Sequence, residues 1–520
     1  MNREIYKKIG LALILLVILA LGFMIRFRGI PFGLPLETHP DEPRIVSSAL
    51  RIAKTGNLNP HFLNYPSMYF YMQAALYKAT ISQSDTPIKD IRPLLFLRGR
   101  IMTVLISVGT LIAVFILCRI LFGPIAALAA TAFLAFSSNH IANSFLITVD
   151  SPMTFWVVMS ALMSALILTR GPKWSFYILN AIFIGFAIGS KYTAVFAGLP
   201  LLFAHLSVNA FSFKKIINWK GIIAVPLIVA AFLFTTPYSV LDHHQFFQAL
   251  HIVGSIYSAG NPGVGTSHFS YGKYFSMLID GFGTLPLLFS LAGLLLLFFY
   301  PKKKDWNAGF FVFTFPLFFF PFIGAFPYCF MRTLMPILPF LAILAGFCVS
   351  VLWDMGISSH SASPASGPGR VNRAWMIPVA VLGMGVAIFG IALQGQKALA
   401  YVHQVTLPDT RATCKVWIEE NLTPGSRIVR DFYTPPLDKK TFKVTRLGIA
   451  SLMKVKDFSD YDYVLTSDFD YGRFFAEESK YPDQVEAYKK IFTYPLIKAF
   501  QSDGVHDSGP YLRLFRVTNP

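Results

Sequence analysis

The chain has 520 residues, of which 54% are hydrophobic and only 14% are charged. Soluble domains carry about 25% charged residues, and the mean hydropathy of this chain is +0.54. This composition argues against a soluble protein and predicts a polytopic α-helical membrane protein. The net charge is +18, but the basic residues lie in short clusters between apolar runs. That distribution favours membrane lipids as partners, and no nucleic acid is expected.

About eleven apolar runs are long enough to cross a membrane, at roughly 20 residues each. The first run follows a basic N-terminus. It is predicted to be an uncleaved span, because Arg26 and Arg28 follow it without a small-residue cleavage pattern. The runs are 9–26, 99–118, 121–138, 152–169, 175–190, 193–209, 221–237, 274–299, 308–325, 333–353 and 374–394.

The charges of the loops between these runs predict the orientation of the chain. With the N-terminus inside, every inner segment carries Lys or Arg, whereas the outer stretches 139–150 and 238–272 carry neither. Cytoplasmic loops are enriched in Lys and Arg. We therefore predict an inner (plasma) membrane protein with a cytoplasmic N-terminus and its C-terminus outside. The inner Ser/Gly/Pro-rich stretch 358–373 is expected to be a mobile linker.

Two outer loops, 27–98 and 238–273, and the tail 395–520 are predicted to lie outside the membrane. Asp409 or Thr410 suits the N-cap of a helix that runs through residue 420 of the tail. The expected strands of the tail span 426–429, 463–467 and 511–517. The organisation is therefore a transmembrane domain over 1–394 and a small soluble α/β domain over 395–520.

The first outer loop contains the sequence Glu37-Thr-His39-Pro40-Asp41-Glu42-Pro43-Arg44. Two adjacent carboxylates are unusual in a chain with only 27 acidic residues. Pro43 suits the first turn of a helix, whose N-terminal dipole would face the two acids. Its basic side would carry Arg44, Ser47, Arg51 and Lys54, which is typical of an amphipathic helix on a membrane surface. Asp41 is then either an active-site acid or an ordinary helix cap.

A second outer helix is expected after Tyr65-Pro66-Ser67. Its residues Tyr69, Phe70 and Tyr71 are predicted to form an aromatic element at the membrane interface. This element is either a headgroup anchor or part of a substrate site.

Three isolated charges lie at the outer ends of predicted spans. Asp150 costs free energy there unless it is solvated, paired or liganded, and it is either a helix cap or a functional acid. Lys191 and Arg332 either extend to the interface as solvated cations or clamp a lipid phosphate, which suits guanidinium geometry.

The metal-binding signal is weak. His243 and His244 in the outer loop 238–273 are the candidates, but adjacent histidines rarely bind one ion together, so a divalent metal is only a possible cofactor. The four cysteines show no metal or disulfide spacing and are predicted to be free thiols.

Taken in order, these motifs resemble the polyprenyl-phosphate-sugar-dependent glycosyltransferases of the GT-C fold, which include protein O-mannosyltransferases and aminoarabinose transferases. The matching segments are 39–44, Tyr65-Pro66, Asp150, 189–193 and Arg332 with Pro336 and Pro339. The resemblance implies a GT-C transmembrane domain of about eleven helices.

The resemblance also implies roles for single residues. Asp41 would be the catalytic base, Glu42 would position Asp41 or the acceptor, and Asp150 would be a second acid near the reaction centre. Arg44 would contact the lipid phosphate, and His39 belongs to the same motif. Aminoarabinose transferases carry Lys where this chain has Tyr65, which argues against aminoarabinose transfer to lipid A.

The function predicted from these observations is transfer of a sugar from a polyprenyl-phosphate donor to a hydroxyl of a lipid, glycan or protein acceptor on the outer face. The transfer would be an inverting single displacement. The alternatives are a membrane transporter or lipid flippase and a non-catalytic envelope assembly protein. Transporters usually place polar sites near the bilayer midplane in repeated halves, whereas the polar residues here gather at the outer edge.

Overall fold

The structure is a computed structural model. It describes residues 2–82, 87–212, 215, 217–260, 262–263, 268–299, 303–360, 376–447 and 458–517. The chain divides into two compact units, which are described separately. The first unit comprises 1–30, 41–258 and 268–399, and the second comprises 31–40, 259–267 and 400–520. The expected linker 358–373 falls largely outside the described residues.

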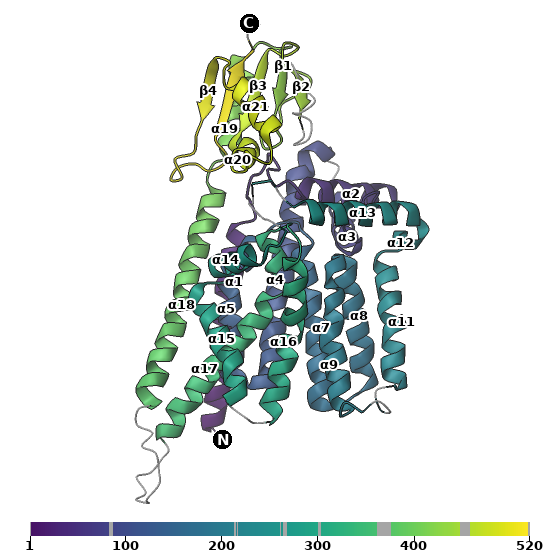
Figure 1. The fold of residues 1–520 in the computed structure, drawn as a ribbon, viewed down its shortest axis with the longest axis vertical. Coiled ribbons are helices and arrows are strands. Elements are labelled where there is room, and N and C mark those ends of the chain that lie inside the picture. Colours follow the sequence, from purple (N-terminus) through teal and green to yellow (C-terminus); the bar gives the residue numbers. More distant parts are fainter. Residues whose placement is uncertain are drawn as a thin grey trace, which may run out of the picture. The chain divides into compact units, whose positions relative to one another are not determined.

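The first unit is a bundle of helices (Figure 1). In chain order they are α1 (Asn2–Arg28), α2 (Glu42–Thr55), α3 (Met68–Ile81), α4 (Ile88–Phe122), α5 (Pro124–Ala135), α6 (Ser138–Ala142), α7 (Asp150–Arg170), α8 (Trp174–Ser190), η1 (Tyr192–Ala197), α9 (Gly198–Val208), α11 (Trp219–Thr235), α12 (Tyr238–Leu241), α13 (His243–Ala259), α14 (Tyr271–Gly281), α15 (Thr284–Phe299), α16 (Lys303–Gly324), η2 (Met331–Leu334), α17 (Leu338–His360) and α18 (Met376–Thr406). The helix η2 is a short 3-10 helix, as is η1.

In the part of the chain that the structure describes, six helices are long and apolar enough to cross a membrane. They lie in α1, α4, α7, α16, α17 and α18. A bent pair, α14 with α15, would make a seventh span, and four shorter apolar segments correspond to α5, α8, η1 with α9, and α11. Each predicted run therefore coincides with helix, while the number of complete crossings stays a prediction.

The run 274–299, expected to be one span, is bent by 110° between α14 and α15. Gly283 lies at the bend with φ +104, a conformation that only glycine adopts readily. A Cβ at this position would lie 2.3 Å from the Gln394 amide nitrogen. Hydropathy could not show the bend, because the apolar character continues through it.

Glycines allow close approach between helices of the bundle. A Cβ on Gly293 of α15 would lie 2.1 Å from the carbonyl oxygen of Leu344 in α17. On the opposite side of α17, a Cβ on Gly346 would lie 2.3 Å from the carbonyl oxygen of Ala126 in α5. Membrane helices pack through such small residues because lipid offers no hydrophobic driving force for their association.

Helices α2 and α13 lie across one end of the bundle (Figure 1). The predicted amphipathic helix is confirmed in α2, whose basic side is exposed and whose Ile45, Ala49 and Ile52 are buried. The following helix α3 is also confirmed, but its predicted interfacial role is wrong for two residues. Tyr69 and Phe70 have no exposed surface, because they pack into the bundle.

The second unit contains a five-stranded sheet in the order β2-β1-β3-β5-β4. Strands β2, β1 and β3 are parallel, whereas β5 is antiparallel to β3 and β4. The strands are β1 (Arg427–Arg430), β2 (Lys443–Arg446), β3 (Tyr463–Ser467), β4 (Leu496–Phe500) and β5 (Leu512–Arg516), and the helices are α19 (Thr410–Asn421), α20 (Asp468–Phe475) and α21 (Pro482–Ile491).

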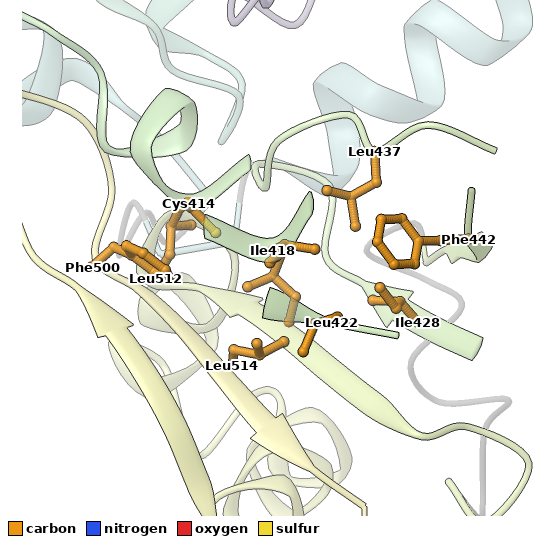
Figure 2. Close-up of a cluster of buried hydrophobic side chains, with 10 residues drawn as sticks. Cys414, Ile418, Leu422, Ile428, Leu437, Phe442, Phe500, Leu512 and Leu514 are labelled. Carbon is orange, nitrogen blue, oxygen red and sulfur yellow. The ribbon is translucent and has the colours of Figure 1, made fainter. Parts of the chain in front are cut away.

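Successive strand residues point to opposite sides of the sheet, and helices cover both of its faces. On one face Ile428 and Leu514 pack against α19 (Figure 2), and Leu465 belongs to the same cluster. On the other face their neighbours Val429, Val464 and Phe515 pack against α20 and α21. The α/β character and all three predicted strands are confirmed, as is the cap at Asp409, whose side chain accepts from the Arg411 amide.

The four cysteines are free thiols, as predicted, and all four are buried.

Candidate active site

The site consists of two carboxylates and two cations brought together at the end of the bundle where α2 lies. Arg332, in η2, donates a hydrogen bond from Nη1 to Oδ2 of Asp41, which precedes α2. The Nε of Arg332 lies 4.0 Å from Oδ2 of Asp150. The Nζ of Lys191 donates to Oδ1 of Asp150 at 2.7 Å. Four charges predicted separately from the sequence thus form one network.

The four side chains differ in their access to solvent. Asp41 is 27% exposed and Arg332 is 19% exposed, whereas Lys191 is 12% exposed and Asp150 only 3%. A ligand can therefore reach Asp41 and Arg332 most readily. Asp150 lies behind them and holds the two cations in place.

Helix capping does not explain either acid. The N-cap of α2 is Asp41, but its side chain makes no capping hydrogen bond. Asp150 is the first residue of α7, and the N-cap is Val149. Both carboxylates bind cations instead, so the alternative of simple caps is wrong for both. Extension of Lys191 and Arg332 to the interface as solvated cations is wrong for the same reason.

Tyr65 belongs to this electrostatic environment. Burial raises the pKa of its phenol, and the negative charge of Asp41 raises it further, against the opposing effect of Arg332 and Lys191. The hydroxyl therefore stays protonated and can donate a hydrogen bond. Nearby, the Tyr192 hydroxyl donates to the Leu63 carbonyl at 2.8 Å and holds the segment that leads to Tyr65.

Arg332 is held in its charged form. Burial opposes the charge, but Asp41, Tyr65 and Asp150 act more strongly together, and the pKa of Arg332 is raised well above its usual value. Its guanidinium lies over the Phe330 ring, 4.9 Å from the centroid. The Asn139 amide donates to the Met331 carbonyl at 2.8 Å, which anchors η2 to α6.

Glu42 lies beside Asp41 in sequence but has a different environment, because it has no exposed surface. It is paired with the equally buried Arg100 of α4, whose Nε donates to Oε1 of Glu42 at 2.9 Å. The same Oε1 accepts from the Ile147 amide at 2.8 Å. Glu42 thus ties α2 to α4 and to the segment that leads into Asp150.

The remaining predicted site residues lie outside this network. Arg44 is exposed on α2, and its guanidinium lies 4.6 Å from the centroid of the Phe62 ring. His39 belongs to the segment 31–40 of the second unit. His243 and His244 are exposed on α13 with their ring centroids 4.4 Å apart.

Among the described residues, no group of three His, Cys, Asp or Glu side chains is placed to hold a metal ion. The possible divalent metal stays an untested prediction.

Two contributors to the site were missed from the sequence. Arg100 lies in the predicted span 99–118, yet it pairs with the buried Glu42 carboxylate. The sequence feature that could have revealed this role is an arginine at the start of an apolar run. Tyr328 lies four residues before Arg332, and its own pKa is raised, chiefly by burial.

Two solved structures have a similar arrangement of helices. ArnT from Cupriavidus metallidurans, bound to undecaprenyl phosphate, matches with a TM-score of 0.55 at 13% identity, over 97% of each chain. The archaeal oligosaccharyltransferase AglB from Archaeoglobus fulgidus, in complex with an inhibitory peptide and a dolichol-phosphate, matches with a TM-score of 0.59 at 12% identity. That match covers 96% of this chain and 74% of AglB. The chain has the GT-C fold.

The sequence of this GT-C chain also matches a family profile. Residues 95–234 match the dolichyl-phosphate-mannose-protein mannosyltransferase family. This segment contains Arg100, Asp150 and Lys191, whereas Asp41 and Arg332 lie outside it. No curated protein matches the chain.

Proposed function

We propose that this protein is a glycosyltransferase that moves a sugar from a polyprenyl-phosphate donor to an acceptor hydroxyl on the outer face of the membrane. The observation that carries the proposal is the contact between Asp41 and Arg332 beside Lys191 and Asp150. It places a solvent-accessible carboxylate next to cations that suit a phosphate. The GT-C fold and the match to a mannosyltransferase family support the same reaction class.

The donor phosphate would bind Arg332 and Lys191. A guanidinium binds phosphate oxygens with two parallel hydrogen bonds, and an ammonium adds a second positive charge. Binding of the phosphate to Arg332 competes with Asp41 for the same donors and releases that carboxylate. The polyprenyl chain would lie among the membrane helices. In the two compared structures, undecaprenyl phosphate and dolichol-phosphate are the bound lipids.

The released Asp41 would act as the general base. The acceptor oxygen attacks the anomeric carbon while its proton passes to the Asp41 carboxylate. The bond between the anomeric carbon and the phosphate oxygen breaks, and both electrons stay with the polyprenyl phosphate. Arg332 and Lys191 stabilise the negative charge that develops there. One displacement inverts the anomeric configuration.

Glu42 and Asp150 support this step without touching the substrate. Glu42 is a positioning residue in this proposal, because it is fully buried and holds the first turn of α2 through Arg100. Asp150 holds the two cations. Arg44 is proposed to contact the lipid phosphate, as the resemblance implies, and His39 of the same motif is proposed to bind the substrate.

The test compares cells that produce the wild-type protein, Asp41→Asn or Asp280→Asn with cells that lack the gene. Asp280 is the matched control, because it is an exposed acid on α14 outside the network. Mass spectrometry of envelope glycans, lipids and proteins should detect a sugar addition with the wild-type and control proteins. The addition should be absent with Asp41→Asn and without the gene.

The same experiment separates the alternatives. Full addition with Asp41→Asn, present at wild-type abundance in the membrane, would show that Asp41 is not the base. If deletion of the gene changes no glycan mass but abolishes uptake of a lipid-linked sugar into vesicles, the protein is a transporter or flippase. If it changes only the assembly of an envelope complex, the protein is a non-catalytic partner.

A further inference from the structure

A cavity of about 360 Å³ lies between α8, α9 and α11. Its wall is aliphatic over most of its surface and includes Leu201, Ile217, Ala224, Val225 and Ile228. Its polar contribution comes from one pair of side chains, in which the Tyr177 hydroxyl and His205 Nδ1 are 2.7 Å apart. The volume falls within the range of about 300–1,000 Å³ that small-ligand sites occupy. The wall chemistry suits a hydrocarbon chain.

This cavity is remote from the candidate active site. The helix α8 has 17 residues, which is about 25 Å of helix. Lys191 follows its last residue, whereas Tyr177 lies in its first turn and lines the cavity. Figure 1 shows α8, α9 and α11 running side by side away from the end of the bundle where α2 lies. The cavity and the active site therefore lie toward opposite ends of these helices.

The edge of the cavity carries positive charge. Lys173 precedes α8 and is exposed, as is Lys215. The Nζ of Lys220 lies 5.9 Å from the centroid of the Trp174 ring. Lys220 directly precedes Gly221, which lines the cavity. At α11, the Asn218 amide donates to the Lys215 carbonyl at 2.8 Å and holds this lysine next to the helix.

Exposed indoles accompany these lysines. Trp174 is 43% exposed and Trp219 is 71% exposed. Tryptophan and basic residues together are typical of the boundary between hydrocarbon and headgroups. Lys173, Lys215 and Lys220 each lie within four residues of a lining residue in the chain, and we call these three lysines the cationic rim. No acidic residue occurs between Gly171 and Lys191 or between Leu206 and Leu241.

We propose that this cavity binds an anionic phospholipid, with one acyl chain between α9 and α11 and the phosphate group on the cationic rim. The apolar wall suits the acyl chain, and the rim selects the negative headgroup. Each lysine near a membrane surface increases affinity for an anionic lipid by about fivefold. The bound lipid would hold α11 to the rest of the bundle.

Gly198 offers a way to fill the cavity without disturbing the fold. It lines the cavity, and a Cβ built on it has no neighbour within 4 Å. Gly198→Leu should therefore occupy the space that the acyl chain would take. Gly385 of α18 is the matched control, because a Cβ there also has no neighbour within 4 Å and the residue does not line the cavity.

The experiment places the full-length protein in nanodiscs of phosphatidylcholine that contain phosphatidylglycerol, and counts retained lipids by native mass spectrometry. The wild-type protein and Gly385→Leu should retain one phosphatidylglycerol, and Gly198→Leu should lose it. A variant with Lys173, Lys215 and Lys220 changed to glutamine should lose affinity by about fivefold per lysine. The corresponding arginine variant should keep it.

Three results would overturn the proposal. The first is equal retention of phosphatidylglycerol by Gly198→Leu and wild type. The second is equal retention of phosphatidylcholine, which would show that the rim does not select charge. The third is a polyisoprenyl lipid in the cavity of protein purified from its own membranes. None of these results depends on glycosyl transfer, so failure here is distinct from failure of the proposed function.

Discussion

The guanidinium of Arg332 is hydrogen-bonded to the carboxylate of Asp41, although 291 positions separate them in the chain. In the proposed reaction this arginine exchanges its carboxylate partner for the donor phosphate. Hydrogen bonds to charged groups contribute about 1.5–3 kcal/mol, which is roughly 10–100-fold in affinity. Arg332→Gln should therefore weaken binding of undecaprenyl phosphate by roughly 10–100-fold.

Binding can be measured in nanodiscs with added undecaprenyl phosphate. Arg119→Gln is the control, because Arg119 is exposed in the last turn of α4 and outside the network. It should bind like the wild type. Equal affinity of Arg332→Gln and wild type would remove Arg332 from the phosphate site.

The buried pair of Glu42 and Arg100 should tolerate loss of both charges better than loss of one, because a single remaining charge has no partner. Arg100→Met leaves a carboxylate without its cation in the interior, which costs about 3–5 kcal/mol. Glu42→Leu combined with Arg100→Met removes both charges and should recover part of that loss. Thermal unfolding in detergent, followed by intrinsic fluorescence, measures both effects.

Arg170→Met, at the exposed end of α7, controls for loss of a positive charge and should unfold like the wild type. If the double variant were no more stable than Arg100→Met, an unpaired buried charge would not explain the loss.

Close packing of α17 against α5 should make Gly346 intolerant of a methyl group. Gly346→Ala forces the Ala126 carbonyl to move, and overpacking of this kind costs about 1–3 kcal/mol. Gly385→Ala adds the same methyl group to α18 without a neighbour within 4 Å. The unfolding temperature should fall for Gly346→Ala alone. An equal change in both variants would point to helix propensity instead of packing.

The stability of the second unit should depend on pH through Asp470. Burial raises the pKa of Asp470 to about 6, well above the ordinary aspartate value of 3.8. The pKa of the neighbouring Asp431 is raised in the same direction by burial and by Asp470. Between these values the folded protein binds more protons than the unfolded one. The contribution of Asp470 to stability should therefore be fully present below about pH 4 and should be lost as pH rises through 6.

Hydrogen exchange of β1 and β3 peptides in the full-length protein measures this dependence. Asp470→Asn keeps an acceptor for the Tyr433 amide, which binds Asp470 Oδ2 at 2.8 Å, but cannot ionise. Comparing the variant with the wild type at the same pH removes the effect of pH on the intrinsic exchange rate. The variant should show a shallower loss of protection, since Asp431 still titrates. If both proteins lost protection equally as pH rises, Asp470 would not be the group responsible.

Much of the fold follows from local sequence patterns. Apolar runs located the helices of the bundle, and alternation located β1, β3 and β5, because each signal lies within one element. The edge strands β2 and β4 were missed. Lys443, Thr445 and Arg446 of β2 and the first three residues of β4 are exposed, so neither strand carries a clear hydrophobic alternation. The bend at Gly283 was missed because an apolar run does not reveal backbone direction.

The site was predicted residue by residue but not as a network. Asp41, Asp150, Lys191 and Arg332 each stood out as a charge at a membrane edge. Their pairing depends on how distant helices pack, and no local pattern encodes it. The resemblance gave the adjacent acids Asp41 and Glu42 different roles, but the structure shows that Asp41 is accessible and Glu42 is enclosed with Arg100.

Glu42 has a consequence for the geometry of the reaction. It directly follows Asp41, and its Oε1 accepts from the amide of Ile147, three positions before Asp150. The positions of Asp41 and Asp150 are therefore both tied to the buried Glu42 carboxylate, and not to independent loops. Their spacing is set during folding, before any substrate arrives. Such preorganisation means that little reorganisation energy is spent at the moment of transfer.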